Sequence, residues 1–349
     1  MPSTQTVFRY NGNNKAIGAA QPREESIPQV TKHELLIKIR SVSLNYRDIG
    51  IANGKYPFPS KDDLVPCSDA AGDVVEVGEG VRGFEAGDKV VITFDVTNLY
   101  GPQRDWNNGH GGPIDGMLRE YITVPASSVV KIPQSGKQQT YSEWSSLVCT
   151  GVTAWNALYG VNPMKPGAVV LLQGTGGVSI TGLILAKAAG ATTIITSSSD
   201  EKLAYVKEKF GVDHTINYKK NPNWGQKALE ITNGRGVDYI LENGGSGTIA
   251  QSITAIAFGG VISVIGFLAQ ADQSEMPDVA GLALSKGCVV RGVTVGSKQL
   301  LEEVVTYVAN QGLRLPVEKE FGFTQEEVTK AFEYIISGQH IGKVCIRVA

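Results

Sequence analysis

Short apolar runs alternate with helical stretches through the middle of the chain, and this alternation constrains the fold more than any other feature. Ala168–Gln173, Thr192–Thr196 and Val261–Ile265 are strand candidates made mainly of apolar or β-branched residues. Helical stretches follow the first two, at about residues 178–189 and 201–210. Strands that are apolar along most of their length are typical of a parallel sheet covered by helices on both faces. The alternation therefore predicts an α/β fold around a doubly wound parallel sheet.

The first third of the chain has a different pattern, with short strands separated by glycine-rich turns. Leu35–Val42, Asp73–Val77 and Lys89–Ile92 are strand candidates, and Val344–Val348 at the C-terminus resembles them. This pattern predicts a compact, partly open β-barrel to which the C-terminus returns. A chain of 349 residues exceeds the size at which one core keeps growing, so we expect two domains.

Composition and charge exclude several classes of function. The formal net charge is −2 without a clustered basic segment, which argues against a nucleic-acid-binding protein. The four cysteines are scattered, as is usual for free thiols in a reducing compartment. Met1–Tyr10 lacks the layout of a secretory signal, and no run is apolar for long enough to span a membrane. We expect a cytoplasmic protein that acts on a small molecule.

A glycine turn joins the first strand of the α/β region to its helix. Val169–Gln173 runs into Gly174, Gly176, Gly177 and Val178. In a dinucleotide fold the first glycine permits the tight turn and the second lets the backbone approach the pyrophosphate at the helix N-terminus. The motif alone is also compatible with a loop that merely turns. Its place between a strand and a helix favours a dinucleotide site.

The end of the second strand bears on the choice of cofactor. An NAD site usually carries an acidic residue there, which binds the ribose 2′-hydroxyl. This chain has Ser197 and Ser198 instead, with Lys202 close behind. Hydroxyls and an ammonium can donate to a 2′-phosphate, so we expect NADP(H). Ser198 with Glu201 is also a capping-box pattern, and the two interpretations are compatible.

With these pieces in place, the chain resembles the medium-chain dehydrogenase/reductase superfamily over nearly its whole length. The matching segments are Leu44–Asp48, Asp69–Gly78, Gly87–Val90, Gly151–Trp155, Ile216–Tyr218 and Gly342–Val344. Within the superfamily the chain looks like the zinc-independent quinone oxidoreductase and enoyl reductase branch. The resemblance implies a GroES-like catalytic domain, the partly open barrel, at residues 1–127 and 297–349. It also implies a Rossmann-type dinucleotide-binding domain at residues 128–296, and a homodimer.

Matched position by position, the resemblance implies further cofactor contacts. They are Thr153, Gly266 and Phe267 near the nicotinamide, Tyr218 and Lys202 at the 2′-phosphate, and Lys343 at the other phosphates. The competing interpretation is that the aromatic residues only pack and that Lys343 is a surface charge.

The resemblance also bears on metal binding, because the zinc members hold their metal with a Cys, a His and a second Cys or Asp. The three positions correspond to Asn45, Ser68 and Cys149, of which only Cys149 retains a ligand type. Asn and Ser are poor ligands for Zn²⁺, so we expect no metal. A different arrangement of Cys67, Asp69 and Cys149 stays open as an alternative.

A site without a metal favours an acceptor that delocalises incoming charge by conjugation. We expect hydride transfer from NADPH to a quinone or an α,β-unsaturated carbonyl compound. Asn45 is expected to orient the substrate and Tyr46 to supply a proton, although they could also be a turn residue and an aromatic wall. His110, in a glycine-rich loop, could reach the same site. Two other functions stay open: a zinc-type alcohol or carbonyl dehydrogenase with a non-standard metal site, and an NADPH-binding regulatory protein with little turnover.

Overall fold

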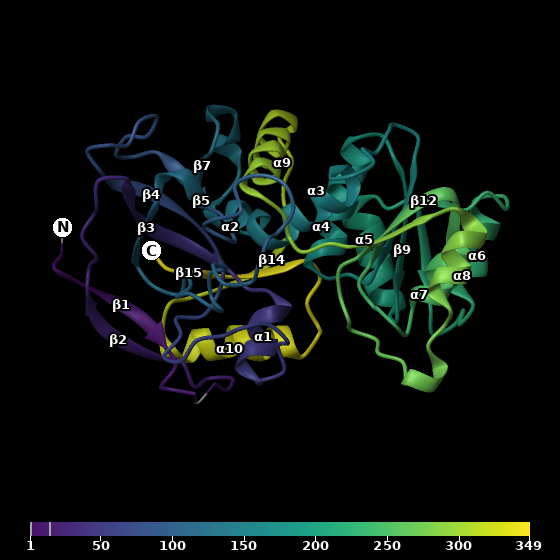
Figure 1. Cartoon of the computed structure of the whole chain (residues 1–349), viewed down its shortest axis with the longest axis horizontal. Coiled ribbons are helices and arrows are strands. Elements are labelled where there is room, and N and C mark those ends of the chain that lie inside the picture. The colour runs from purple at the N-terminus through teal and green to yellow at the C-terminus, as the bar shows by residue number, and fades with distance from the viewer. Residues whose placement is uncertain (1, 14) are drawn as a thin grey trace. The chain divides into compact units, whose positions relative to one another are not determined.

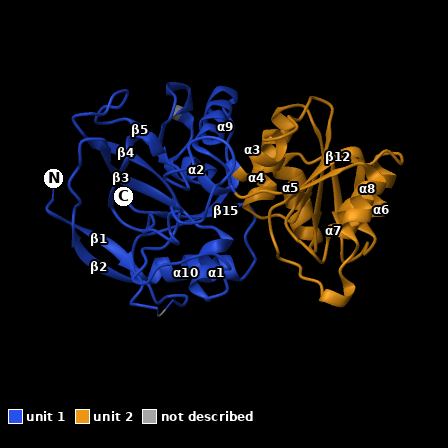
Figure 2. Ribbon diagram, viewed as in Figure 1, with its two compact units in different colours: residues 1–152, 295–349 blue, residues 153–294 orange. Residues whose placement is uncertain are grey.

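The computed structural model describes residues 2–13 and 15–349, which form two compact units (Figure 2). Unit 1 comprises residues 1–152 and 295–349, and unit 2 comprises residues 153–294. Unit 1 therefore extends beyond the expected boundary at residue 127. The reason is that β7 (Val129–Lys131) pairs with β5 (Lys89–Ile92), and α2 (Tyr141–Ser145) packs on two further strands of unit 1.

Unit 1 is built on a seven-stranded sheet in the order β14-β15-β3-β4-β5-β7, with β6 paired to β3. The bounds not yet given are β3 (Glu34–Ser43), β4 (Asp69–Val77), β6 (Tyr121–Pro125), β14 (Val317–Phe321) and β15 (Lys343–Arg347). β1 (Thr4–Arg9) and β2 (Gln21–Ser26) form a separate two-stranded sheet. The pairing of β15 with β3 confirms that the C-terminal strand returns to the first domain.

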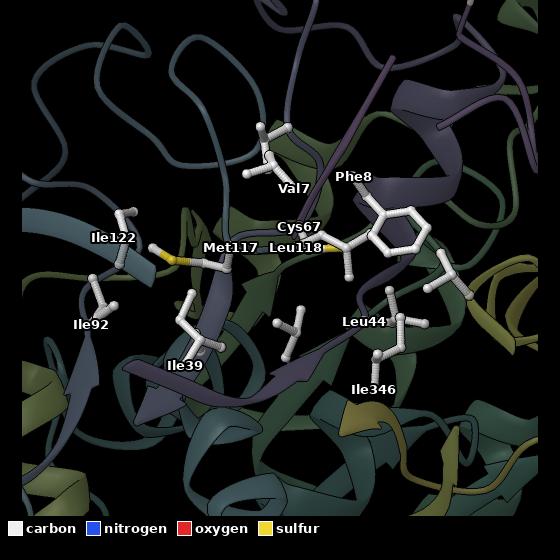
Figure 3. Close-up of a cluster of buried hydrophobic side chains, with 14 of the residues drawn as sticks. Val7, Phe8, Ile39, Leu44, Cys67, Ile92, Met117, Leu118, Ile122 and Ile346 are labelled. Atoms are coloured by element: carbon white, nitrogen blue, oxygen red, sulfur yellow. The ribbon is translucent and has the colours of Figure 1, made fainter. Parts of the chain in front are cut away.

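The helices of unit 1 pack around these strands. They are α1 (Tyr46–Ala52), α2, α9 (Lys298–Gln311) and α10 (Gln325–Ile336), with the π-helical turn η3 at Leu147–Gly151. Figure 1 shows α10 beside α1, which it contacts. Figure 3 shows part of the core, in which Ile39 of β3, Ile346 of β15 and Cys67 lie in one apolar cluster.

Unit 2 contains a six-stranded parallel sheet in the order β10-β9-β8-β11-β12-β13. Its strands are β8 (Val169–Gln173), β9 (Thr192–Ser197), β10 (His214–Asn217), β11 (Val237–Glu242), β12 (Ile256–Val264) and β13 (Val289–Gly292). Its helices are α3 (Val152–Tyr159), α4 (Gly177–Ala188), α5 (Asp200–Phe210), α6 (Trp224–Ile231), α7 (Ile249–Ala255) and α8 (Val279–Lys286).

The strand order of unit 2 reverses direction between β8 and β11. The chain first steps outward from β8 to β10, then returns and steps outward in the opposite direction from β11 to β13. Right-handed crossovers then place helices on both faces, which is the predicted doubly wound arrangement. In such sheets ligands bind outside the carboxyl ends of the strands at the point of reversal. No helix in the part of the chain that the structure describes is long and apolar enough to cross a membrane.

Candidate functional site

The glycine turn lies at the carboxyl end of β8, beside the point of reversal. Gly174 has φ +77°, a conformation that favours glycine, and the turn leads into α4. Gly176 is the N-cap of α4, and no side chain caps the helix there. In the part of the chain that the structure describes, no atom beyond Gly176 and its two chain neighbours lies within 4 Å of the place that a Cβ at Gly176 would occupy. The first turn of α4 therefore offers its backbone N–H groups and open space to an anion.

Ser179 holds the turn against the neighbouring strand. Its hydroxyl donates to the Gln173 carbonyl (2.6 Å) and accepts from Asn243 Nδ2 (2.9 Å). One helical turn later, a Cβ at Gly182 would lie 2.7 Å from the Leu241 side chain, so α4 packs closely on the sheet. The small hydroxyl residue Ser179 thus joins the helix to both strands at the reversal point.

The serines after β9 lie at the same edge of the sheet. Ser197 is buried and Ser198 is half-buried. The hydroxyl that caps α5 belongs to Ser199, which accepts from the Lys202 backbone N–H (3.2 Å). The capping-box interpretation of Ser198 with Glu201 is therefore wrong by one residue, and Ser198 is not used as the cap.

Asp200, one of two carboxylates in the first turn of α5, is engaged by other groups. Asp200 forms an ion pair with Lys220 and accepts from Asn217 Nδ2 (2.7 Å). The hydrogen bond from Lys220 lowers the pKa of Asp200, with a smaller contribution from Asn217. Tyr218 follows β10 beside this cluster and is partly exposed, and its backbone N–H donates to the Ser197 carbonyl (3.0 Å).

Three other residues expected near the nicotinamide have different environments within unit 2. Thr153 is buried in α3, whereas Phe267 exposes 43% of its surface. Gly266 follows β12, and a Cβ there would lie 2.5 Å from the Asn243 carbonyl oxygen. Gly266 and Phe267 thus lie at the carboxyl edge of the sheet with the glycine turn.

Unit 1 contains a second cluster, centred on Asn45 and Lys343. Asn45 is the N-cap residue of α1, and its side chain is almost fully buried. Lys343, the first residue of β15, is 2% exposed. Its ammonium donates to Asn45 Oδ1 (2.6 Å) and to the Leu44 carbonyl (2.6 Å). The structure therefore directs Lys343 into unit 1, and does not leave it as a surface charge.

A buried carboxylate completes this cluster. Asp69 Oδ1 accepts from the Ser68 hydroxyl (2.6 Å), and Oδ2 accepts from the Cys149 backbone N–H (3.0 Å). Burial raises the pKa of Asp69, and the nearby Lys343 charge opposes that rise. Asn45 Nδ2 makes no well-formed hydrogen bond within the described residues, although the amide lies close enough to Asp69 to help lower its pKa.

The donor set at the three positions that match zinc ligands does not fit the metal. Asn45 Oδ1 is engaged by an ammonium, whose charge would repel Zn²⁺. The Ser68 hydroxyl donates to Asp69, and burial raises the pKa of the Cys149 thiol to about 12. Within residues 2–13 and 15–349, no three His, Cys, Asp or Glu side chains gather in a way that could hold a metal ion.

The environment of Cys67 does not suit a metal ligand that would act with Asp69 and Cys149. Its side chain is fully buried beside Met117 and Leu118 in the apolar core (Figure 3). Burial raises the pKa of the Cys67 thiol well above its usual value. A thiol held in an apolar cluster is a poor metal ligand, so the environment of Cys67 does not favour a metal site of Cys67, Asp69 and Cys149.

Tyr46 and Asp48 lie on the first turn of α1. Tyr46 exposes 56% of its surface, so its hydroxyl is accessible to a ligand of unit 1. Asp48 is buried and accepts from the Asn45 backbone N–H (2.8 Å). Burial raises the pKa of Asp48 to about 6, against the opposing effect of Arg47.

Arg47 fixes the loop that carries His110. Its guanidinium donates to the His110 carbonyl (2.8 Å) and lies over the rings of Tyr56 and Phe94. The His110 ring is buried, with Nδ1 2.9 Å from the Asp115 carbonyl oxygen. Burial lowers the pKa of His110 to about 4. His110 is therefore a neutral, buried residue of the loop and is not presented at the surface.

Comparison with known proteins agrees with this two-part architecture. Residues 31–134 match the alcohol dehydrogenase GroES-like domain, and residues 177–310 match the zinc-binding dehydrogenase family. A zinc-type alcohol dehydrogenase-like protein of Schizosaccharomyces pombe is 42% identical, over 98% of this chain and 99% of that protein. The chain belongs to the medium-chain dehydrogenase/reductase superfamily.

Other members of the superfamily similar to this chain carry several different names. A quinone oxidoreductase-like protein 2 homolog of Nematostella vectensis is 29% identical, over 90% of this chain and 81% of that protein. The acryloyl-coenzyme A reductase of Metallosphaera sedula is 27% identical, over 93% and 95%. A crystal structure from Sinorhizobium meliloti 1021 that carries an alcohol dehydrogenase name has 35% identity and a TM-score of 0.87, covering 100% of both chains. This medium-chain dehydrogenase/reductase is an oxidoreductase of a family that binds a nicotinamide cofactor.

Proposed function

We propose that this oxidoreductase uses NADPH to reduce quinones or α,β-unsaturated carbonyl compounds without a metal. The observation that carries the proposal is the hydrogen bond from the buried Lys343 ammonium to Asn45 Oδ1. It places a fixed positive charge where the zinc members have their first metal ligand. A cation there disfavours a second cation, because charges at this separation repel strongly in a buried site.

The residues of unit 1 support reduction of a conjugated acceptor. A bound nicotinamide cofactor supplies the hydride. Asn45 Nδ2 would donate to the substrate oxygen, and the ammonium on Oδ1 polarises the amide and strengthens that bond. A conjugated acceptor can take up hydride with this hydrogen bond alone, since its added charge is delocalised. The resulting enolate would then gain a proton from the Tyr46 hydroxyl or from a water that Tyr46 positions. Lys343 is then a positioning residue that acts through Asn45.

The residues of unit 2 favour NADPH over NADH. Unit 2 would be the dinucleotide-binding domain and unit 1 the catalytic domain. Gly174, Gly176, Gly177 and Val178 would hold the pyrophosphate. The 2′-phosphate would lie among four residues that offer hydroxyls, an aromatic edge and an ammonium: Ser197, Ser198, Lys202 and Tyr218. Gly266, Phe267 and Thr153 would contact the nicotinamide half.

An aspartate at Ser198 should reverse the cofactor preference. The new carboxylate would repel a 2′-phosphate and could bind a 2′-hydroxyl, so the NADPH-to-NADH ratio of kcat/KM should fall by about 10- to 100-fold. Steady-state kinetics with both cofactors measure this ratio. The matched control Ser198→Ala removes the hydroxyl without adding charge, and its effect should be severalfold at most. A ratio that Ser198→Asp leaves unchanged contradicts the NADPH assignment.

A second substitution tests Tyr46 as the proton donor. Tyr46→Phe should lower kcat for an enone about 10- to 100-fold with little change in KM, since a removed donor costs about 10²–10⁴-fold unless water substitutes. The exposure of Tyr46 makes partial substitution by water the expected case. Tyr100→Phe, at another exposed tyrosine of unit 1, is the control. Equal turnover by wild type and Tyr46→Phe would remove Tyr46 from the mechanism.

One experiment separates this function from its two competitors. Elemental analysis of the purified protein should find less than stoichiometric zinc, and chelation should leave NADPH oxidation with quinones or enones intact. Stoichiometric zinc lost together with alcohol or ketone turnover would favour a zinc-type dehydrogenase. Tight NADPH binding without turnover of any quinone, enone, enoyl thioester or aldehyde would favour a regulatory protein.

We also propose a homodimer formed through unit 2. β13 is the outer strand of the parallel sheet, so one side of its backbone has no partner strand. Phe258 and Leu284 near it are 79% and 83% exposed. An exposed strand edge with neighbouring apolar side chains is typical of a surface that pairs with a second chain.

A further inference from the structure

A buried polar network joins β8 and β11 at the point where the sheet of unit 2 reverses. Glu242, the last residue of β11, is fully buried. Its Oε1 accepts from the Gly244 and Gly245 backbone N–H groups (2.8 and 3.0 Å) and from the Thr248 hydroxyl (2.5 Å). Its Oε2 accepts from Gln173 Nε2 (2.6 Å).

Gln173, the last residue of β8, faces Glu242 across the two adjacent strands. Its Oε1 accepts from the Asn243 and Gly244 backbone N–H groups (3.0 and 3.1 Å). The two side chains together therefore bind the backbone of the loop that follows β11. Ser252 of α7 also donates to Glu242 and accepts from Gln173 Nε2 (2.9 Å).

The same loop is tied to the glycine turn. Asn243 Nδ2 donates to the Gln173 carbonyl (3.0 Å) and to Ser179 Oγ (2.9 Å). The loop also needs its glycines, because a Cβ at Gly244 would lie 2.1 Å from Thr248 Oγ1 and Gly245 has φ +86°. Five groups thus donate hydrogen bonds to the Glu242 carboxylate, and these bonds hold a short loop beside the glycine turn.

We propose that the Gln173–Glu242 pair is a positioning device that presets the nicotinamide half of the cofactor site. The proposal rests on the proposed binding of a nicotinamide cofactor by unit 2. In a doubly wound sheet the first half binds the adenosine side and the second half the nicotinamide side. The loop at residues 243–245 begins the second half, whereas Ser197 and Ser198 belong to the first. The pair should therefore govern affinity for the intact dinucleotide and not for its adenosine fragment.

The complementarity of the two side chains allows a reciprocal exchange as the test. Glu242→Gln places an amide donor against either Gln173 Nε2 or the loop N–H groups, and Gln173→Glu places two carboxylates side by side. Each should weaken NADPH binding at least about tenfold, because a buried group loses its partner. The double variant Gln173→Glu/Glu242→Gln restores every donor–acceptor match, because the Ser252 hydroxyl can accept from the new amide and donate to the new carboxylate. Its NADPH affinity should return to within about threefold of wild type.

Calorimetric or fluorescence titration with NADPH and with adenosine 2′,5′-bisphosphate measures both halves of the site. The single variants should lose affinity for NADPH and keep that for the bisphosphate. Thr193→Val is the matched control, since it removes a buried hydrogen bond to Asp213 in unit 2 (2.8 Å) away from this loop. It should lower thermal stability without changing either affinity. If a single variant does not fold, Asn243→Ala, which leaves the Gln173–Glu242 pair intact, should show the same selective loss.

Equal losses for NADPH and the bisphosphate would overturn the proposal, as would an exchanged double variant no better than the singles. Unchanged NADPH affinity in the single variants would do the same. A wild-type protein that binds neither ligand would instead contradict the proposed function, so the two failures can be distinguished.

Discussion

Replacement of Gly176 by valine should raise the NADPH dissociation constant at least about 100-fold while leaving the fold intact. The backbone of Gly176 has φ −79°, which any residue can adopt, and among the described residues no atom outside Gly176 and its two chain neighbours lies within 4 Å of the new Cβ. We expect the side chain to meet the pyrophosphate, which is proposed to lie against this backbone. Valine is a poor N-cap, so a stability loss of about 1 kcal/mol is expected.

Titration with NADPH and thermal denaturation together test this prediction. Gly176→Ala should show an intermediate loss of affinity, because its Cβ is smaller. Gly322→Val is the control, since a Cβ at Gly322 would make only ordinary contact with the Glu327 side chain, 3.6 Å away, and the position lies in unit 1. It should alter neither affinity nor stability. A Gly176→Val protein that binds NADPH normally would place the phosphates elsewhere.

Substitution of Lys343 by methionine should lower kcat for an enone by about 100-fold or more. The change removes the ammonium from Asn45 Oδ1 and keeps the apolar stem in the core. Breaking a buried charge pair by removing one partner typically costs about 3–5 kcal/mol, so Lys343→Met is also expected to be less stable. The uncompensated charge would be the Asp69 carboxylate, whose pKa Lys343 helps to lower.

A second substitution separates stability from turnover. In Lys343→Met/Asp69→Asn a neutral amide replaces the Asp69 carboxylate. The new amide N–H can donate to the Ser68 hydroxyl, which donates to Asp69 in the wild type. The double variant should regain most of the lost stability and none of the lost turnover. The resemblance to the superfamily implies a different role, in which Lys343 binds cofactor phosphate. In that case the variants would show a raised KM for NADPH with kcat preserved, which would contradict the positioning role.

Local sequence patterns predicted much of unit 2. The apolar strands, the glycine turn and the start of α4 depend on residues that are close in sequence, so local sequence patterns suffice to predict them. The compact unit 1 includes residues 128–152, which lie beyond the expected boundary, because these residues belong to a unit by what they pack against, and that is a tertiary property. α10 was missed although Thr324, whose hydroxyl accepts from the Glu327 N–H (3.3 Å), is a recognisable N-cap signal.

The inward direction of Lys343 and the Gln173–Glu242 pair could not be predicted from the sequence. Gln173 and Glu242 are polar residues at the ends of two buried strands. Because neighbouring parallel strands align their carboxyl ends, this pattern could have indicated that both lie at the same edge of the sheet. Their pairing, however, depends on strand order, which periodicity does not specify.

The sequence by itself determined the parallel sheet, the glycine turn and the absence of a carboxylate at Ser197, since each depends on backbone preference or residue type at one place. Only the tertiary structure decided which charges face one another. Lys343 and Asn45 are 298 positions apart, and their 2.6 Å hydrogen bond exists because β15 packs beside the strand that leads into α1. Burial then makes that contact strong, because the Lys343 side chain is only 2% exposed and solvent screens its charge little.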